Sequence, residues 1–298
     1  EGEWLIFSVG GGSLKEENED RGKSKNEIYP HKSMNEILAY CKSENLTIPE
    51  YVKRFEKDID SYLVKVLEQM HITLNNGLSS EGYLPGRLHV KKKAKEFYQK
   101  YISNPTRESL VYAYALANSE ENASGNIVVT APTCGSCAVV PAVLLSFQKN
   151  NNVSDEKIIE ALMVAGIIGN IVKTNASISG AEVGCQGEIV ACSMASAALT
   201  YLENGDNYDI EYAGEVALEH HLGMTCDPVD GMVQIPCIER NAVAAMQAYN
   251  VASYVKLAGH NHKITLDSVI QVMNETGKDM HTKYRETSTG GLAIHKRG

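Results

Sequence analysis

The feature that most constrains the fold is a helical periodicity that starts near residue 31 and continues almost to the C-terminus. Apolar residues recur at intervals of three and four, which places them on one face of a helix. The segment 58–74 shows this clearly, with one apolar stripe made of Ile59, Tyr62, Leu63, Val66, Leu67 and Met70. The pattern predicts a mostly α fold.

Start signals and small residues add detail to this prediction. Ser33 followed by Glu36 is a capping box, and Ser154 is placed to cap the helix after it. Residues 163–169 and 191–198 are rich in Ala, Gly, Ser and Val, whose small side chains let helix axes approach closely. We therefore expect buried central helices there. The full set of expected helices covers 58–74, 94–102, 108–120, 138–147, 155–172, 189–202, 210–221, 238–257 and 266–284.

Residues 3–9 are nearly the only convincing strand, and they run into the glycines 10–12. A charged segment, 15–25, follows as an expected surface loop. A single strand leaves its backbone hydrogen-bonding groups unpaired, so we expect its partner to lie outside this sequence.

Composition excludes several kinds of partner. The chain has 28 basic and 37 acidic residues, a net charge of −9, and no long basic run, which argues against nucleic acid. No stretch of ~18–20 consecutive apolar residues is present, so we expect no membrane span. The acidic start, Glu1–Glu3, is unlike a secretory signal. The seven cysteines are then expected to be free, metal-bound or catalytic.

Three cysteines lie where loops meet predicted helices. Cys185 stands in the glycine-rich motif 180–188, Cys226 precedes Asp-Pro, and Cys237 follows ten intervening residues later. A helix N-terminus favours a thiolate, so these positions suggest a metal or cluster site with three sulfur ligands. The alternative is that they are buried core cysteines, since their spacing matches no short ligand motif.

Two other motifs are ambiguous. Cys134 and Cys137 form a C-x-x-C, which suits a redox pair, half of a zinc site or a substrate-binding turn. We favour the turn, because neither a βαβ pattern nor a second C-x-x-C accompanies it. His220 and His221 fall at a predicted helix end, where the helix dipole favours a cation. This structural role is favoured over that of a base near Cys226.

Taken together, five motifs resemble one known family. They cover residues 121–133, 175–188, 222–228, 233–241 and 283–293. These segments resemble the catalytic region of the bacterial iron–sulfur-dependent L-serine dehydratases (L-serine ammonia-lyases). The likeness runs from about Trp4 to Ile294, which is almost the whole chain.

The resemblance implies an enzyme that converts L-serine to pyruvate and ammonia without pyridoxal phosphate. A [4Fe–4S] cluster would be held by Cys185, Cys226 and Cys237, leaving one iron free to act as a Lewis acid on the serine hydroxyl. A related lyase acting on threonine or cysteine, or a non-catalytic metal-binding or redox protein, remains an alternative.

The resemblance also suggests residues near the substrate. Asn175, Ser177 and Ser179 are candidates to hold substrate or order the cluster loop. Candidates for substrate binding are Thr133, Cys134 and Arg285.

Two departures from the family pattern concern the ends of the chain. Residues 1–30 are expected to be an N-terminal strand and charged linker, the tail of a missing N-terminal (beta) domain, and 31–298 the helical catalytic domain. The Gly-Pro-Ser-Ser-Ser-His-Thr motif of that domain does not occur here, nor does a C-terminal cysteine after His295. We expect L-serine as substrate, the missing domain or subunit as partner, a homo- or hetero-oligomer, and a cytoplasmic location.

Overall fold

The computed structural model describes residues 5–8, 14–16 and 28–295. It is mostly helical, as predicted. The principal helices are α1 (Met34–Glu44), α2 (Ile48–Phe55), α3 (Ile59–Ser79), α4 (Ala94–Ser103), α5 (Arg107–Ala123), α6 (Val139–Asn151), α7 (Asp155–Asn175), α8 (Gly180–Val183), α9 (Cys185–Glu188), α10 (Val190–Leu202), α11 (Asn207–Glu219), α12 (Cys237–Ala258) and α13 (Leu266–Asp279). Short 3-10 turns are η1 (Val229–Gly231), η2 (Thr282–Tyr284) and η3 (Gly291–Ile294).

The predicted start signals are confirmed. Ser33 forms a capping box with Glu36 at the start of α1, and the Ser154 side chain caps α7. Several elements differ from expectation, and α3 and α6 run five and four residues past their expected ends. Helix α2 was not singled out, although Thr47 and Glu50 form a second capping box at its start. Helix α13 ends at Asp279, five residues early, because the backbone turns extended at Met280.

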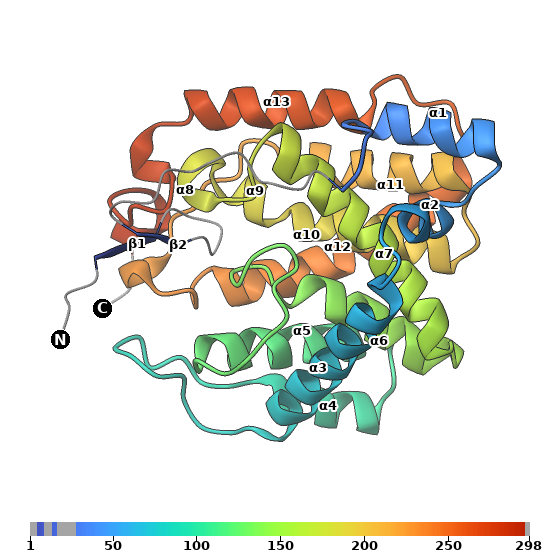
Figure 1. Ribbon diagram of the computed structural model, residues 1–298. Helices are drawn as coiled ribbons and strands as arrows, with labels where there is room; N and C mark the ends of the chain where they lie inside the picture. The colour runs from blue at the N-terminus through green and yellow to red at the C-terminus, as the bar shows by residue number, and fades with distance from the viewer. Residues whose placement is uncertain (1–4, 9–13, 17–27, 296–298) are drawn as a thin grey trace.

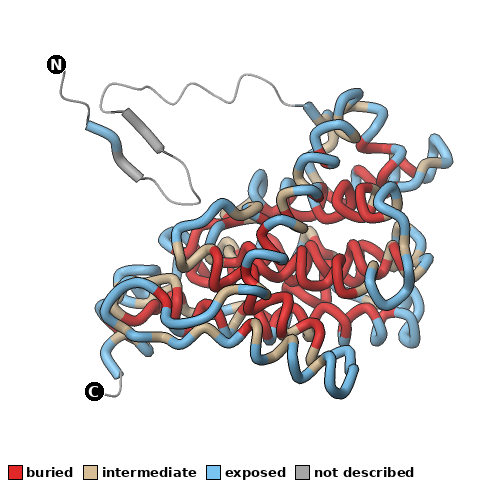
Figure 2. The backbone as a smooth tube through the Cα atoms, turned by 90° about the horizontal axis from the view of Figure 1, so that it is seen from below, coloured by how far each residue is buried: buried red, intermediate tan, exposed pale blue. Residues whose placement is uncertain are grey.

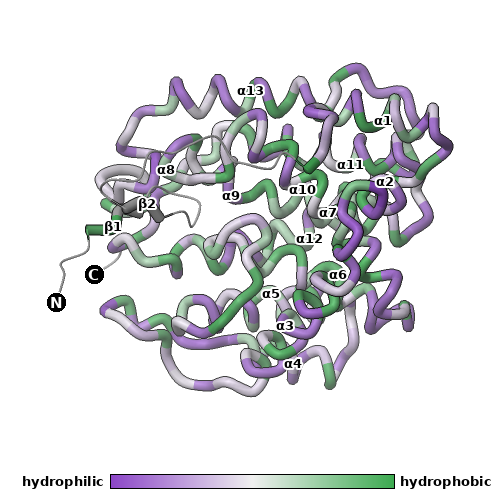
Figure 3. Tube along the Cα trace, viewed as in Figure 1, coloured by the Kyte–Doolittle hydropathy of each residue, from purple (hydrophilic) through white to green (hydrophobic). Residues whose placement is uncertain are grey.

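The helices form layers around a buried centre. In Figure 1, α10 and α12 run through the middle, with α13 and α1 on one side and α3, α4 and α5 on the other. Helix α10 contacts α6, α7, α11 and α12, while α5 contacts α3, α4, α6 and α12. The central helices are almost wholly buried in Figure 2, and Figure 3 shows the hydrophobic residues concentrated along them.

Close packing in this centre depends on the small residues. The Ser193 hydroxyl of α10 donates to the carbonyl of Gly214 in α11 over 2.6 Å. A Cβ added at Gly214 would lie 3.3 Å from Ser193 Oγ and 3.4 Å from Ile168. One added at Gly169 of α7 would lie 2.9 Å from Met194 Sδ. The prediction of buried small-residue helices is confirmed.

Helix α7 bears on the expectation that no helix spans a membrane. It is the one helix among the described residues that is long and apolar enough to cross a bilayer, with a window of hydropathy 1.4. However, 67% of that window is buried inside the protein, which is how a core helix behaves. Polar residues interrupt its apolar runs, which is why a search for consecutive apolar residues missed it.

The N-terminal strand has a partner in this chain. β1 (Ile6–Ser8) pairs antiparallel with β2 (Leu14–Glu16), and Ile6 lies opposite Glu16. The expectation of a partner outside the sequence is therefore wrong for this pair. The expected strand 3–9 extends beyond the described residues at Trp4 and Val9, so its full length stays a prediction.

Candidate metal centre

Two of the three predicted ligand cysteines lie together in the structure. The sulfurs of Cys185 and Cys226 and a carboxylate oxygen of Glu188 all lie within 4.8 Å of one another. Glu188 Oε2 is 4.0 Å from Cys185 Sγ and 3.9 Å from Cys226 Sγ. All seven cysteines are free. The chain thus brings two thiols forty residues apart to one carboxylate.

Backbone pairing with the C-terminal segment positions Cys226. Its N–H donates to the carbonyl of Tyr284 over 2.8 Å, and its own carbonyl accepts from the N–H of Glu286 at 2.7 Å. Cys226 therefore lies in an extended segment. The helix that follows it is only the short turn η1, which begins after two intervening residues.

Glycines make room for the sulfurs. A Cβ added at Gly180 would lie 2.8 Å from Cys226 Sγ and 3.3 Å from a Glu286 carboxylate oxygen. Gly184, directly before Cys185, has φ +74°. A Cβ added there would lie 2.7 Å from the Met224 carbonyl oxygen. Only glycine fits both positions without displacing a neighbour.

Gln186, next to Cys185, joins three parts of the site. It is fully buried, and its Oε1 accepts from the Gly223 N–H at 2.9 Å and from the Thr276 hydroxyl at 3.1 Å. Its Nε2 donates to the Met273 carbonyl at 3.2 Å. This amide therefore ties α9 to α13 and to the loop that leads into Cys226.

The electrostatics favour a thiolate at Cys185. The hydrogen bond from Cys226 lowers the pKa of Cys185 to about 7, with a further contribution from the Arg240 guanidinium. The pKa of Cys226 is raised by the same bond and by burial. Burial, followed by the charges of Cys185 and Glu286, raises the pKa of Glu188 to about 8. Burial thus keeps Cys226 and Glu188 protonated beside the more acidic Cys185, and a bound cation would favour the ionised form of all three.

Arg240 and Asp227 anchor the rim of the site. Arg240 donates to the Thr225 carbonyl at 2.7 Å and to Asp227 Oδ1 at 3.1 Å. Asp227 Oδ2 accepts from the Leu292 N–H at 2.8 Å. A Cβ at Gly291, where φ is +60°, would lie 2.2 Å from that oxygen. These contacts hold the C-terminal Gly-Gly-Leu motif against the segment that carries Cys226.

Cys237 lies in the same electrostatic environment but outside the compact group. It is buried as the first residue of α12, as its position before a predicted helix suggested. Burial, then the charges of Cys185 and Glu188, raises its pKa to about 12. Asn241 donates to its carbonyl at 2.8 Å and to the Gly135 carbonyl at 2.7 Å. Asn241 thereby links this cysteine to the C-x-x-C turn.

The C-x-x-C turn meets the site through Thr133. The Thr133 hydroxyl lies 3.4 Å from Glu188 Oε1, and a Cβ at Gly135 would lie 2.8 Å from the same oxygen. Cys134 is exposed, whereas Cys137 is buried with its sulfur 3.9 Å from the Asn118 carbonyl. The two sulfurs have different surroundings, and the turn abuts the carboxylate.

Of the serines before the cluster loop, Ser179 is the one poised to meet a ligand. Its buried hydroxyl lacks a hydrogen-bond partner within the described part of the chain, and the next residue, Gly180, contacts Cys226. The Ser177 hydroxyl donates to the Glu182 carboxylate and accepts from the Ser179 N–H at 3.1 Å. This pairing orders the loop.

The two remaining candidates have different surroundings. Asn175 is exposed at the end of α7, where its amide donates to the Lys32 carbonyl at 2.7 Å. Arg285 contacts the Glu182 carbonyl at 3.4 Å, and its buried Nε has no partner among the described residues. Asn175 therefore anchors the chain near α1, while Arg285 retains a donor for another group.

A groove of about 680 Å³ approaches these residues from the side of α2, α3 and α7. Pro132 and Ile178 line it, and they adjoin Thr133 and Ser179 respectively. Its other walls include Gly166, Gly169 and Met194 from the small-residue helices. The groove therefore reaches the segment whose Thr133 hydroxyl meets Glu188 and the segment whose Gly180 lies beside Cys226.

The donor set suits a thiophilic metal. Two sulfurs and a carboxylate converge, a third sulfur shares their charges, and no residue larger than glycine fits beside Cys226. Sulfur ligands select zinc, copper(I) or iron–sulfur centres over magnesium or calcium. Glu188, Gln186 and Arg240 were missed as functional residues in the sequence. Glu188 lies inside the cysteine motif, but periodicity gives no sign that its carboxyl turns back between two sulfurs.

Comparison with known proteins gives a consistent result. A family model described as "Serine dehydratase alpha chain" matches residues 13–293. The L-serine dehydratase of Haemophilus influenzae is 43% identical over 97% of this chain, and L-serine dehydratase 1 of Escherichia coli is 44% identical over the same share. The L-serine dehydratase of Streptomyces coelicolor is 42% identical. In each case the match covers 67% of the relative's length.

Proposed function

Because the chain belongs to the serine dehydratase alpha-chain family, we propose that it is the catalytic part of an L-serine ammonia-lyase, which forms pyruvate and ammonia. The observation that carries this proposal is the convergence of Cys185, Cys226 and Glu188 within 4.8 Å, at the motifs shared with the family. A carboxylate beside two thiols is a donor set that suits a metal.

Cys185, Cys226 and Cys237 would hold the metal group, which we take to be a [4Fe–4S] cluster rather than pyridoxal phosphate. When bound, such a cluster supplies a Lewis-acidic iron that makes hydroxide a better leaving group. Cys185 is already the most acidic of the three thiols, and its thiolate is ready to bind.

The residues around the sulfurs would bind and orient L-serine. Arg285 offers a buried donor to the substrate carboxylate, and the unpaired hydroxyl of Ser179 offers a second polar contact. Glu188, whose carboxyl burial favours in the protonated form, would be the proton donor to a departing oxygen. Thr133 holds this carboxyl in place.

The remaining third of the relatives' length would supply the rest of the enzyme. We propose that an N-terminal (beta) domain or subunit completes the active site, with residues 1–30 as a short strand and charged connection to it. We also propose that the protein forms an oligomer. A cytoplasmic location fits the cluster, since an oxygen-sensitive cluster suits a reducing compartment.

The test is pyruvate formation from L-serine by the anaerobically reconstituted chain, with and without a separately produced N-terminal domain of a relative. We expect turnover with both parts present and loss of turnover in Cys226→Ser. Faster turnover of threonine or cysteine would overturn the substrate assignment. One zinc and no sulfide per chain would favour a metal-binding or redox protein instead.

A further inference from the structure

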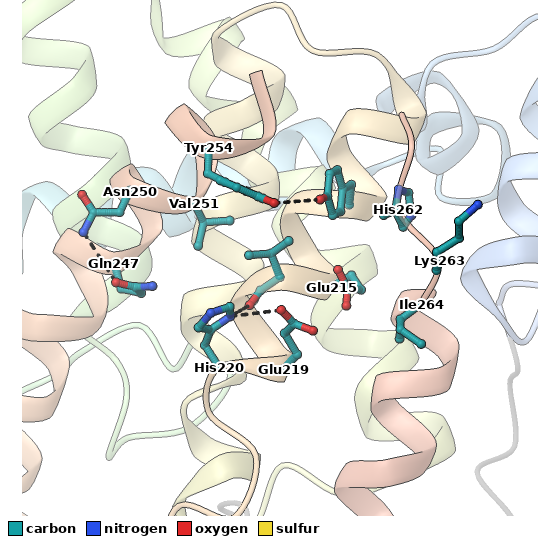
Figure 4. Close-up of a pocket in the computed structure, with 12 residues that line it drawn as sticks. Glu215, Glu219, His220, Gln247, Asn250, Val251, Tyr254, His262, Lys263 and Ile264 are labelled. Carbon is teal, nitrogen blue, oxygen red and sulfur yellow. Dashed lines mark hydrogen bonds and ion pairs between the residues drawn. The ribbon is translucent and has the colours of Figure 1, made fainter. Parts of the chain in front are cut away.

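Helix α12 has different surroundings at its two ends. Its middle and last turns line a cavity of about 500 Å³ against α11, where Gln247, Asn250 and Tyr254 lie and none of the three predicted ligand cysteines does (Figure 4). Its first turn instead carries Cys237 and Arg240. These two residues are three positions apart, so they share one face of the helix. The first turn therefore brings a cation beside a predicted sulfur ligand.

The guanidinium of Arg240 holds the segment that carries Cys226. It donates to the Thr225 carbonyl at 2.7 Å and to Asp227 Oδ1 at 3.1 Å, which are the residues directly before and after this cysteine. Asp227 is itself fixed, because it is buried and its other oxygen accepts from the Leu292 N–H. A planar fork with separate donors matches two such acceptors, whereas a lysine ammonium has no fixed geometry of this kind. Arg240 therefore holds the chain on both sides of Cys226.

The same guanidinium bears on the other sulfurs. Burial disfavours its charge, but its pKa is raised because Cys185, then Asp227 and Cys237, stabilise the cation. Burial raises the pKa of Glu188 and of Cys237, and the guanidinium acts against burial at both. One cation thus links the segments of all three predicted ligands.

A bound iron–sulfur group would need such a cation. Three thiolates on a [4Fe–4S] core leave about one net negative charge, and a buried anion is costly unless a cation or hydrogen bonds compensate it. The Arg240 side chain is only 19% exposed, so little water screens its charge. Its Nη2 is paired with Asp227, while Nη1 bonds to the neutral carbonyl of Thr225. Part of the positive charge therefore stays available to the sulfurs.

We propose that Arg240 is the positioning residue of the metal centre, which holds the Cys226 segment and balances the negative charge of the three thiolates when the group is bound. This inference rests on the proposed function, since it assumes the iron–sulfur group. Arg240 has two separable effects: the fork sets where Cys226 lies, and the charge sets how readily the bound group accepts an electron. Lysine keeps the charge and loses the fork, whereas glutamine loses both.

Redox titration of the anaerobically reconstituted full chain, followed by EPR spectroscopy, tests the effect of the charge. Arg240→Gln is expected to make reduction about tenfold less favourable, which is a shift of about 59 mV to lower potential for one electron. Arg240→Lys should stay close to the parent, because a cation is still present. Arg54→Gln, the same change in an exposed ion pair with Glu44, is the matched control and should keep the parent's potential. The parent's potential in Arg240→Gln would overturn the proposal.

Release of iron to EDTA tests the effect of the fork. Arg240→Lys and Arg240→Gln should both lose iron about tenfold faster than the parent, the usual effect of removing a residue that orients a metal ligand. If Arg240→Gln does not fold, the lysine variant carries the test, and iron release at the parent's rate would overturn the proposal. Faster release in both variants with no change in potential would reduce Arg240 to a purely structural role, which also overturns it.

The same measurements separate this inference from the proposed function. A parent chain that holds no iron after reconstitution overturns the proposed function and this inference with it. A parent chain that holds iron, with variants that match it in potential and in iron release, overturns this inference alone.

Discussion

The small-residue core and the metal centre are built in different ways. In the core, α7, α10 and α11 meet through close contacts such as that between Ser193 and Gly214. Polar groups there, such as the Ser193 hydroxyl, bond to neighbouring helices. In the metal centre, segments from four parts of the chain meet through single hydrogen bonds, and they leave two thiols and a carboxyl crowded together. The core is complete as a polypeptide, whereas we propose that a bound metal group completes the site.

This difference implies a separation of effects. Substitutions in the core should change the free energy of unfolding and leave the metal content of the folded protein intact. Substitutions in the site should lower the metal content and change the free energy of unfolding less. The loss of metal should be largest for residues that contact the sulfurs. Each substitution below tests that separation, from the largest expected loss of stability to the smallest.

Leu199→Ala should have the largest effect on stability. Leu199 is fully buried in α10, and removing its side chain leaves a cavity that costs about 3 kcal/mol of unfolding free energy. Iron per folded chain should not change. Denaturant unfolding and metal analysis measure the two quantities. Leu257→Ala, at a position 88% exposed, is the control and should change neither; loss of iron in Leu199→Ala would break the separation.

Gln186→Leu should affect both quantities, because this residue lies where the two regions meet. The substitution leaves the Gly223 N–H and the Met273 carbonyl without their partner, at a cost of about 2 kcal/mol. It also loosens α9, so metal affinity should fall about tenfold. Gln271→Leu, on the exposed face of α13, is the matched change. Unaltered metal affinity would show that the Gln186 network serves folding alone.

Glu188→Gln should change how the stability of the metal-free protein depends on pH. The folded-state pKa of Glu188, about 8, lies above the unfolded value near 4.5, so the folded state binds the extra proton between these values. Stability should therefore fall as pH rises from about 4.5 to 8, by about 5 kcal/mol for a shift of that size, at about 1.4 kcal/mol per pKa unit. The glutamine variant should lack this slope. Parallel pH profiles would contradict the assignment of the carboxyl as a buried acid.

Gly180→Ala should have the smallest effect on stability and a clear effect on metal. The added Cβ would lie 2.8 Å from Cys226 Sγ, so the sulfur must move, and metal affinity should fall about tenfold. Stability should change by less than about 1 kcal/mol. Gly166→Ala in α7, which meets open space, is the control. Equal metal affinity in both variants would mean that Cys226 can shift without consequence.

Much of the fold was predictable from the sequence because periodicity and capping act locally. The capping box at Ser33 and the small-residue helices reflect interactions within a few residues or a repeated face. Helix α2 could have been predicted in the same way, from the capping box that Thr47 and Glu50 form. The partner of β1 was not, because a three-residue strand gives no signal for what it pairs with.

The sequence indicated two of the sulfurs that meet in the structure, those of Cys185 and Cys226, but not the geometry in which they meet. The motifs identified Cys185, Cys226 and Cys237, but the position of Cys226 depends on pairing with Tyr284 and Glu286, nearly sixty residues away. No periodicity describes such a contact. Glu188 was missed for the same reason, since its role comes from the fold that turns it toward both sulfurs.

Iron and acid-labile sulfide content after strictly anaerobic reconstitution tests the central claim most directly. We expect about four irons and four sulfides per chain in the parent protein, and loss of both in Cys185→Ser, Cys226→Ser and Cys237→Ser. Cys192→Ser is the matched control, because Cys192 is a buried thiol bonded to the Ala244 carbonyl at 3.3 Å within the core. Its content should equal that of the parent. A full complement of iron and sulfide in all three ligand variants would contradict the account.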